Sequence, residues 1–97
     1  MKFTQWINEK HFDTVSNYVS DVAMLQEAMI EELNAVNLYR AMAAKAGNAE
    51  TKRVLLHIAE EEQHHIGELQ ALIKKLDPSF EVGLVDGAEE IEEIGIK

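Results

Sequence analysis

Residues 55–76 have the sequence LLHIAEEEQHHIGELQALIKKL, an apolar stripe at alternating three-and-four spacing with two polar interruptions. This spacing is typical of a helix that packs in a bundle. The interruptions are Glu62 and His65, which are three residues apart and therefore share one helical face. The whole stripe comprises Leu55, Ile58, Glu62, His65, Leu69, Leu72 and Leu76. It predicts a helix with a polar site in its packing seam.

A second stripe precedes the first in the chain and has one ionisable interruption, Glu32. It comprises Val22, Leu25, Met29, Glu32, Val36, Tyr39 and Ala43. No Pro or Gly occurs between Val15 and Ala46, and most residues there are good helix formers. We therefore expect a first helix from about Val15 to Ala46.

The two predicted helices are joined by a very short turn. Gly47 follows the first helix, and glycine commonly lies just past a helix end. Asn48 can cap the second helix, which we expect from about Ala49 to Leu76. That helix should end before Pro78, because the residue before a proline disfavours the α region. The sequence thus predicts an all-α fold built on an antiparallel two-helix hairpin.

Glu32 and Glu62 lie about 15 residues on either side of the turn, so they should face each other across the hairpin. An unpaired carboxylate in an apolar seam costs several kcal/mol, and two that face each other cost more. A bound cation would offset this cost. Oxygen and imidazole ligands without thiolate suit iron, manganese or zinc. We therefore predict that Glu32, Glu62 and His65 form a metal site.

The ligand count predicts the assembly. Ferritin-like carboxylate sites take one Glu from each of two helices and a Glu-x-x-His motif from each of the other two. One hairpin supplies half of that set, namely Glu32, Glu62 and His65. Two copies related by a two-fold axis would supply all of it. We therefore expect the hairpin to dimerise into a ferritin-like four-helix bundle.

Each polar seam residue also has an ordinary explanation. A seam Glu can be solvated, a lone His is more often structural than a ligand, and Glu-x-x-His arises easily by chance in a Glu-rich helix. The coincidence of three such residues at one level favours the metal site.

Tyr39, seven residues after Glu32, is either a core aromatic or a hydrogen-bond partner of a metal ligand, and these roles are compatible.

A second polar row lies one position off the seam of the second helix. It comprises His57, Glu61, His64 and Glu68. A solvated helix face is the more common explanation of such a row. The alternative is an outer cation site that uses Glu61, with Glu31 from the first helix.

The composition limits the classes of protein to which the chain can belong. It has 97 residues, no cysteine, and 18 acidic against 9 basic residues. Disulfides and thiolate metal sites are therefore excluded, and so acidic a chain argues against nucleic-acid binding. No apolar run is long enough to span a membrane and no signal peptide is evident, so we expect a cytoplasmic protein. Metal binding or oligomerisation would stabilise so short a chain.

We divide the chain into three segments: an N-terminal arm over residues 1–12, the hairpin over 13–78, and a C-terminal tail or short helix over 79–97. The acidic run AEEIEE, residues 88–93, is expected to be solvated. The sequence IGIK, residues 94–97, offers two apolar anchors around a glycine, which suits a peptide that docks in a partner's groove.

The strings EELNAVNLY, residues 31–39, and EEEQHH, residues 60–65, resemble those of the encapsulated ferritins, a branch of the ferritin-like superfamily. The resemblance extends over about residues 15–76. It implies ferroxidase activity, the oxidation of Fe(II) to Fe(III) with oxygen, at an inter-subunit di-iron centre. It places Glu32, Glu62 and His65 at ligand positions of the family, and Tyr39 at the position of a family tyrosine.

The resemblance also implies an assembly and a partner. Members of the family form rings of dimers, commonly decamers, and are cargo inside an encapsulin shell. This chain has Asn34 and Leu38 where the family commonly has an acidic residue and a Trp, in an outer region of iron uptake. Glu31 and Glu61 remain, so we expect that outer region to be weakened or rearranged. The ending IEEIGIK loosely resembles encapsulin-targeting tails; the alternative is a disordered terminus with no partner.

Three functions compete on these observations. The first is a ferroxidase for iron storage within an encapsulin nanocompartment. The second is a non-catalytic helical oligomerisation module whose seam carboxylates are merely solvated. The third is a rubrerythrin-like di-iron protein, but the chain has no cysteine and so no rubredoxin segment to pass electrons. We expect a homo-oligomer and no nucleic-acid or membrane partner.

Overall fold

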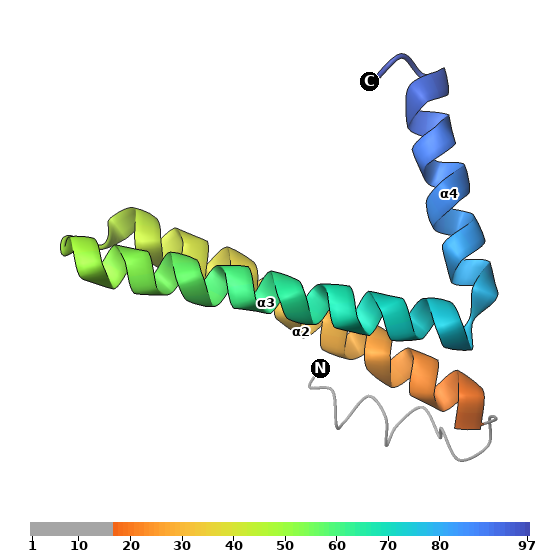
Figure 1. Cartoon of the computed structure of the whole chain (residues 1–97), viewed down its shortest axis with the longest axis horizontal. Coiled ribbons are helices and arrows are strands. Elements are labelled where there is room, and N and C mark those ends of the chain that lie inside the picture. Colours follow the sequence, from red (N-terminus) through yellow and green to blue (C-terminus); the bar gives the residue numbers. More distant parts are fainter. Residues whose placement is uncertain (1–16) are drawn as a thin grey trace.

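The structure, a computed structural model, describes the backbone of residues 17–97 and the side chains of residues 21–97. These residues form three helices and no strand (Figure 1). The helices are α2 (Asn17–Lys45), α3 (Ala49–Leu76) and α4 (Pro78–Glu93). The three helices confirm the predicted all-α fold over the described range. The predicted N-terminal arm lies outside the described residues.

Helices α2 and α3 run side by side as an antiparallel hairpin (Figure 1). Its turn follows the predicted local chemistry, because Asn48 Oδ1 accepts a hydrogen bond from the Thr51 backbone N at 2.8 Å and so caps α3. At the far end of α3, Asp77 Oδ1 accepts from the Ser79 backbone N at 3.2 Å, and Pro78 occupies the first turn of α4. Asp77 thus both ends one helix and caps the next.

The small core of the chain lies between α2 and α3. Its buried apolar residues are Val22, Val36, Ala43, Ala59 and Ile73. Every member of the stripe predicted for α2 is buried or half-buried. In this part of the molecule the seam spacing alone is sufficient to identify the inward face.

The buried line of α3 differs from the predicted stripe by one position. Ala59 and Ile73 are buried and Ile66 is half-buried, whereas Leu72 is 43% exposed. The physical reason is that α2 is the main neighbour of α3 among the described residues, so the line of α3 that faces α2 is the most deeply covered. His65 and Leu72, seven residues apart, belong to the neighbouring face, which α2 leaves exposed.

Helix α4 leaves the end of α3 and points away from the hairpin (Figure 1). It contacts α3 near Pro78, and none of its residues is buried. The acidic run in residues 88–93 is fully helical up to Glu93 and exposed throughout. No helix from residue 17 onward combines the length and the apolar character needed to cross a membrane.

Candidate metal centre

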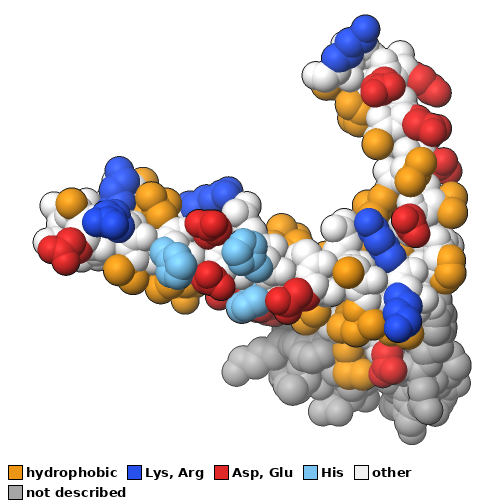
Figure 2. All heavy atoms as spheres, viewed as in Figure 1, with side chains coloured by type: hydrophobic (Ala, Val, Ile, Leu, Met, Phe, Trp, Pro, Cys, Tyr) orange, Lys and Arg blue, Asp and Glu red, His pale blue; other side chains and the backbone are white. Residues whose placement is uncertain are grey.

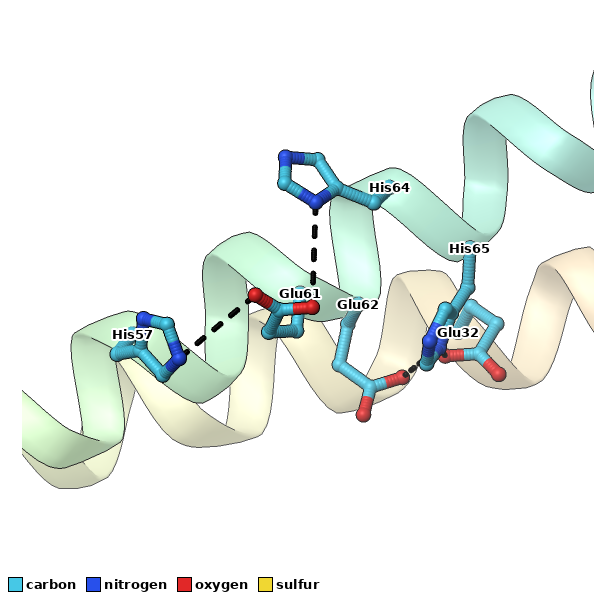
Figure 3. Close-up of polar contacts among 6 residues, drawn as sticks. All are labelled: Glu32, His57, Glu61, Glu62, His64 and His65. Atoms are coloured by element: carbon cyan, nitrogen blue, oxygen red, sulfur yellow. Dashed lines mark ion pairs between the residues drawn. The ribbon is translucent and has the colours of Figure 1, made fainter.

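Glu32 of α2 and the Glu62 and His65 side chains of α3 converge at one level of the hairpin (Figure 3). His65 Nδ1 lies 3.5 Å from Glu32 Oε2 and 3.5 Å from Glu62 Oε2. One ligand atom from each of the three residues lies within 4.8 Å of the other two. The structure therefore brings together the three residues that the sequence singles out, with one imidazole nitrogen aimed between two carboxylates.

The cluster is partly withdrawn from solvent. The side chains of Glu62 and Glu32 are 20% and 27% exposed, and that of His65 is 47% exposed. Glu32 Oε2 is buried and has no hydrogen-bond partner among the described residues. A buried carboxylate oxygen without a partner is costly, and a cation would satisfy it. The donor set, two carboxylates and an imidazole, fits iron, manganese or zinc.

Local structure explains why these side chains meet. Glu62 and His65 are one helical turn apart, so their side chains share a face of α3. Glu32 lies one turn before the buried Val36, which fixes the face of α2 that turns toward α3. Because all three residues stand on packed helices, their relative positions do not depend on a loop.

The outer polar row of α3 forms its own ion pairs, separate from the cluster (Figure 3). His57 Nε2 lies 3.6 Å from Glu61 Oε1, and His64 Nδ1 lies 3.9 Å from Glu61 Oε2. All three side chains are at least half exposed, as expected of a solvated face. Over residues 17–97, Glu32, Glu62 and His65 are the one group of three or more potential metal ligands that converge. Glu31 and Glu61, the residues of the predicted outer site, do not converge with a third potential ligand.

Tyr39 lies on the seam of α2, about two turns beyond Glu32, and is half-buried. That position suits both a core aromatic and a hydrogen-bond partner of a metal ligand. Its role therefore stays a prediction.

An apolar groove near the open end of the hairpin was not predicted as a functional surface. It has a volume of about 200 Å³ and is lined by Asp21, Met24, Leu25, Leu72 and Leu76. Three of these residues, Leu25, Leu72 and Leu76, belong to the predicted seams, where they were expected to be buried in the core. Leu72 lies on the same face of α3 as His65, so the groove and the cluster are uncovered on the same side of that helix.

Comparison with known proteins matches the Rubrerythrin family over residues 23–94. A protein of Pyrococcus furiosus named a ferritin-like-encapsulin shell fusion protein is 41% identical over 71 residues, which are 73% of this chain and 21% of that protein. Two encapsulin nanocompartment cargo proteins of Myxococcus xanthus also match. EncB is 32% identical over 61% of this chain and 37% of its own length. EncC is 40% identical over 48% of this chain and 36% of its own length.

The chain thus spans between about a fifth and somewhat over a third of the length of these curated relatives. A solved structure resembles it over most of both chains. The encapsulated ferritin domain from Pyrococcus furiosus superposes with a TM-score of 0.80 at 36% identity, covering 84% of this chain and 83% of that one. Sequence and helix arrangement agree, and the chain belongs to the rubrerythrin family of ferritin-like domains, in its encapsulated-ferritin branch.

Proposed function

We propose that two copies of the chain form a ferroxidase centre that oxidises Fe(II) to Fe(III) with oxygen. The observation that carries the proposal is the cluster in the hairpin seam. His65 Nδ1 lies 3.5 Å from a carboxylate oxygen of both Glu32 and Glu62, and the Glu32 oxygen is buried without a hydrogen-bond partner. Such a group is poorly satisfied by the chain alone and well suited to a cation.

Glu32, Glu62 and His65 would hold the ferrous substrate. Carboxylate oxygens offset the charge of the ion, and the imidazole adds a neutral nitrogen ligand. Iron supplies the redox chemistry: two Fe(II) ions each lose one electron, and O₂ takes up both electrons with two protons and leaves as hydrogen peroxide. The protein's part is to bind two ions close together in a fixed geometry, so that both electrons reach one oxygen molecule.

A second copy is needed because one hairpin offers only three ligand side chains. Two copies offer four glutamates and two histidines, the set typical of ferritin-like di-iron sites. The uncovered face supports this pairing, since Leu72 and Met24 are 43% and 37% exposed and line the groove on the open side of the cluster. Covering that face would bury apolar surface and convert two helices into a four-helix bundle.

The ferroxidase proposal is tested by adding Fe(II) anaerobically to the purified protein and then admitting oxygen. Wild type should oxidise Fe(II) faster than the uncatalysed reaction and consume oxygen in proportion. Glu60→Ala is a matched control, because Glu60 is exposed on α3 and outside the cluster. A non-catalytic oligomerisation module would associate but give no oxidation above background. Full activity in a verified monomer would refute an inter-subunit centre.

We further propose that the protein stores iron as cargo of an encapsulin shell. The support is that relatives are named as encapsulin cargo proteins and as a shell fusion. The segment 94–97 is suited to docking, because Gly95 adopts a φ of 91° just past α4 and leaves Ile94 and Ile96 70% and 56% exposed. One such peptide would bind weakly, but an oligomer carrying several copies would gain avidity.

Because α4 runs to Glu93, the docking segment can be removed without cutting that helix. The experiment is co-expression with a shell protein of this class, comparing the full chain with a variant that lacks residues 94–97. Targeting through this segment predicts strongly reduced loading. Equal loading of both chains would refute the targeting role and leave the ferroxidase proposal untouched.

A further inference from the structure

The described part of the chain contains three methionines, Met24, Met29 and Met42, and all of them lie on α2. The sequence has no cysteine, so these thioethers are the sulfur atoms that an oxidant would meet there. Met24 and Met42 are 37% and 45% exposed, whereas Met29 is half-buried. Of the three, Met29 is therefore the best screened from an oxidant that arrives from solvent.

Met29 lies one helical turn before Glu32 of the cluster. Residues three apart on a helix share a face, and they are separated by about 4.5 Å along the axis. A helical side chain also leans toward the start of its helix, so the Glu32 side chain extends over the turn that contains Met29. The thioether of Met29 is thus the neighbour of a carboxylate in the cluster.

The other two methionines are farther from the cluster. Met24 and Met42 are eight and ten residues from Glu32, which corresponds to about 12 and 15 Å along α2. Each is also rotated from Glu32 by about 80° around the helix axis, since one turn takes about 3.6 residues. Met24 and Met42 are therefore internal references: they have the same chemistry as Met29, but they are more exposed and more distant.

Apolar side chains flank the cluster within the hairpin. Figure 2 shows histidine and acidic side chains together in the middle of the hairpin, with apolar side chains on either side. One turn from Glu32 or Glu62, Val36 and Ala59 are buried and Ile66 is half-buried. Hydrogen peroxide does not readily oxidise such saturated side chains, whereas it converts a thioether to a sulfoxide. Among the apolar neighbours at this spacing, Met29 is thus the one that peroxide can modify.

The proposed ferroxidase reaction supplies the oxidant, because each O₂ that takes one electron from each of two Fe(II) ions leaves as hydrogen peroxide. The sulfur of a thioether attacks one oxygen of the peroxide, so that the O–O bond breaks and an S–O bond forms. Sulfur loses two electrons, and the second oxygen leaves as water with both protons. The product is methionine sulfoxide, which sulfoxide reductases can convert back to methionine.

We propose that Met29 captures hydrogen peroxide formed at the cluster and becomes its sulfoxide in the first turnovers, ahead of the exposed Met24 and Met42. The inference rests on the proposed ferroxidase function and adds a modification site to it. Met29 also fills space in the packing seam, an ordinary role of a flexible thioether. That role alone predicts no oxidation ahead of the exposed methionines.

The order in which the methionines are oxidised tests the proposal. Wild type is given Fe(II) anaerobically and then oxygen, and fragmentation mass spectrometry locates the sulfoxides in the sample whose Fe(II) oxidation is measured. Turnover should modify Met29 several-fold more than Met24 or Met42. Peroxide added to the metal-free protein should give the reverse order, because exposure then decides. Turnover that modifies the methionines in the order of their exposure would overturn the proposal.

Catalase in the solution separates peroxide captured beside the cluster from peroxide that has escaped. The enzyme destroys free peroxide and is too large to reach a half-buried side chain. Oxidation of Met24 and Met42 should fall to background during turnover, while that of Met29 is retained. With isotopically labelled O₂, the sulfoxide of Met29 should carry the label. Loss of oxidation at all three positions, or an unlabelled sulfoxide at Met29, would refute capture at the cluster.

The peroxide released into solution gives a second readout. Met29→Leu keeps the apolar character and nearly the volume of the side chain, and Met42→Leu is the matched control. In the first turnovers Met29→Leu should release more peroxide per Fe(II) oxidised than wild type or Met42→Leu. The excess should vanish once Met29 of the wild type has been converted. Equal release by all three proteins from the first turnover onward would contradict capture by Met29.

Glu32→Ala separates a failure of this inference from a failure of the proposed function. The variant should leave Met29 unmodified after Fe(II) and oxygen, while its methionines still react with added peroxide. Wild type that oxidises no Fe(II) above background would overturn the ferroxidase function and this inference with it. Wild type that oxidises Fe(II) while Met29 stays unmodified would overturn this inference alone.

Discussion

Helix α3 of the hairpin and helix α4 both begin at a capping side chain, but they differ in how far their residues are buried. Asn48 caps α3 and Asp77 caps α4, and each accepts a backbone hydrogen bond in the first turn that it begins. The hairpin nevertheless contains every buried residue of the described chain, and α4 contains none. Capping therefore defines where helices start, whereas burial among the described residues is confined to α2 and α3.

Glutamates have different chemical surroundings in the two regions. Glu32 and Glu62 interrupt an apolar seam, are 27% and 20% exposed, and share the imidazole of His65. The carboxylates of α4 are exposed and face solvent in the single chain. The first arrangement is costly unless a cation binds, and the second is the ordinary state of a surface glutamate. The same residue type is thus suited to binding a cation in the hairpin and to contact with solvent in α4.

The largest expected difference between the regions is in catalysis. Glu32→Ala should reduce Fe(II) oxidation to the rate of the uncatalysed reaction, because it removes two of the six ligand side chains of a paired centre. Glu90→Ala, in α4, should leave the rate per assembled dimer close to that of wild type. The measurement is initial-rate Fe(II) oxidation with circular dichroism as a check that helix content is retained. Residual high activity in Glu32→Ala would contradict the assigned ligand set.

Core packing should separate the regions next. Ile73→Ala removes a fully buried side chain and should lower the free energy of unfolding by about 2–5 kcal/mol. Ile91→Ala removes an exposed side chain and should change it by less than about 0.5 kcal/mol when the protein is dilute. Urea unfolding at low protein concentration measures both. Equal effects would mean that α4 packs on a surface even in the dilute chain.

Metal should promote association through the hairpin. Two copies brought together without metal would place four carboxylates in one partly buried layer, and their repulsion opposes pairing. A divalent ion reverses this effect, and at a hundred times its dissociation constant it would favour the bound state by about 2.7 kcal/mol. Sedimentation with and without Zn(II), which is redox-inert, tests the expectation. The same distribution of species in both conditions would contradict it, and Glu32→Ala should remove the response.

The hairpin and its cluster could be predicted from sequence because the determining signals are local. Gly47, Asn48 and Pro78 act through backbone geometry and capping, and the helix ends observed lie within about two residues of those expected. The level of Glu32 and Glu62 follows from counting residues on either side of the turn. Once the two helices are antiparallel, few arrangements keep these side chains apart.

The rotation of α3 could not be predicted in the same way. Its apolar residues occupy a broad stripe, and spacing alone does not distinguish Leu72 from Ile73 as the buried member. That choice depends on which neighbours cover the helix, and among the described residues α2 is the main neighbour of α3. The length of α4 was equally open, since its glycines and acidic run disfavour helix while the Asp77 cap and Pro78 favour it.

The smallest expected difference concerns the two caps. Asn48→Ala removes the acceptor for the Thr51 backbone N, and should lower the free energy of unfolding by about 1 kcal/mol. The stability of the whole hairpin should fall, because α3 cannot fray at the turn without losing its packing on α2. Asp77→Ala removes the acceptor for the Ser79 backbone N, but the first turn of α4 covers little of the core. Its effect should therefore be confined to faster amide hydrogen exchange in α4, with the urea midpoint of the hairpin unchanged. A fall in that midpoint equal to the one caused by Asn48→Ala would mean that α4 and the hairpin unfold as one cooperative unit.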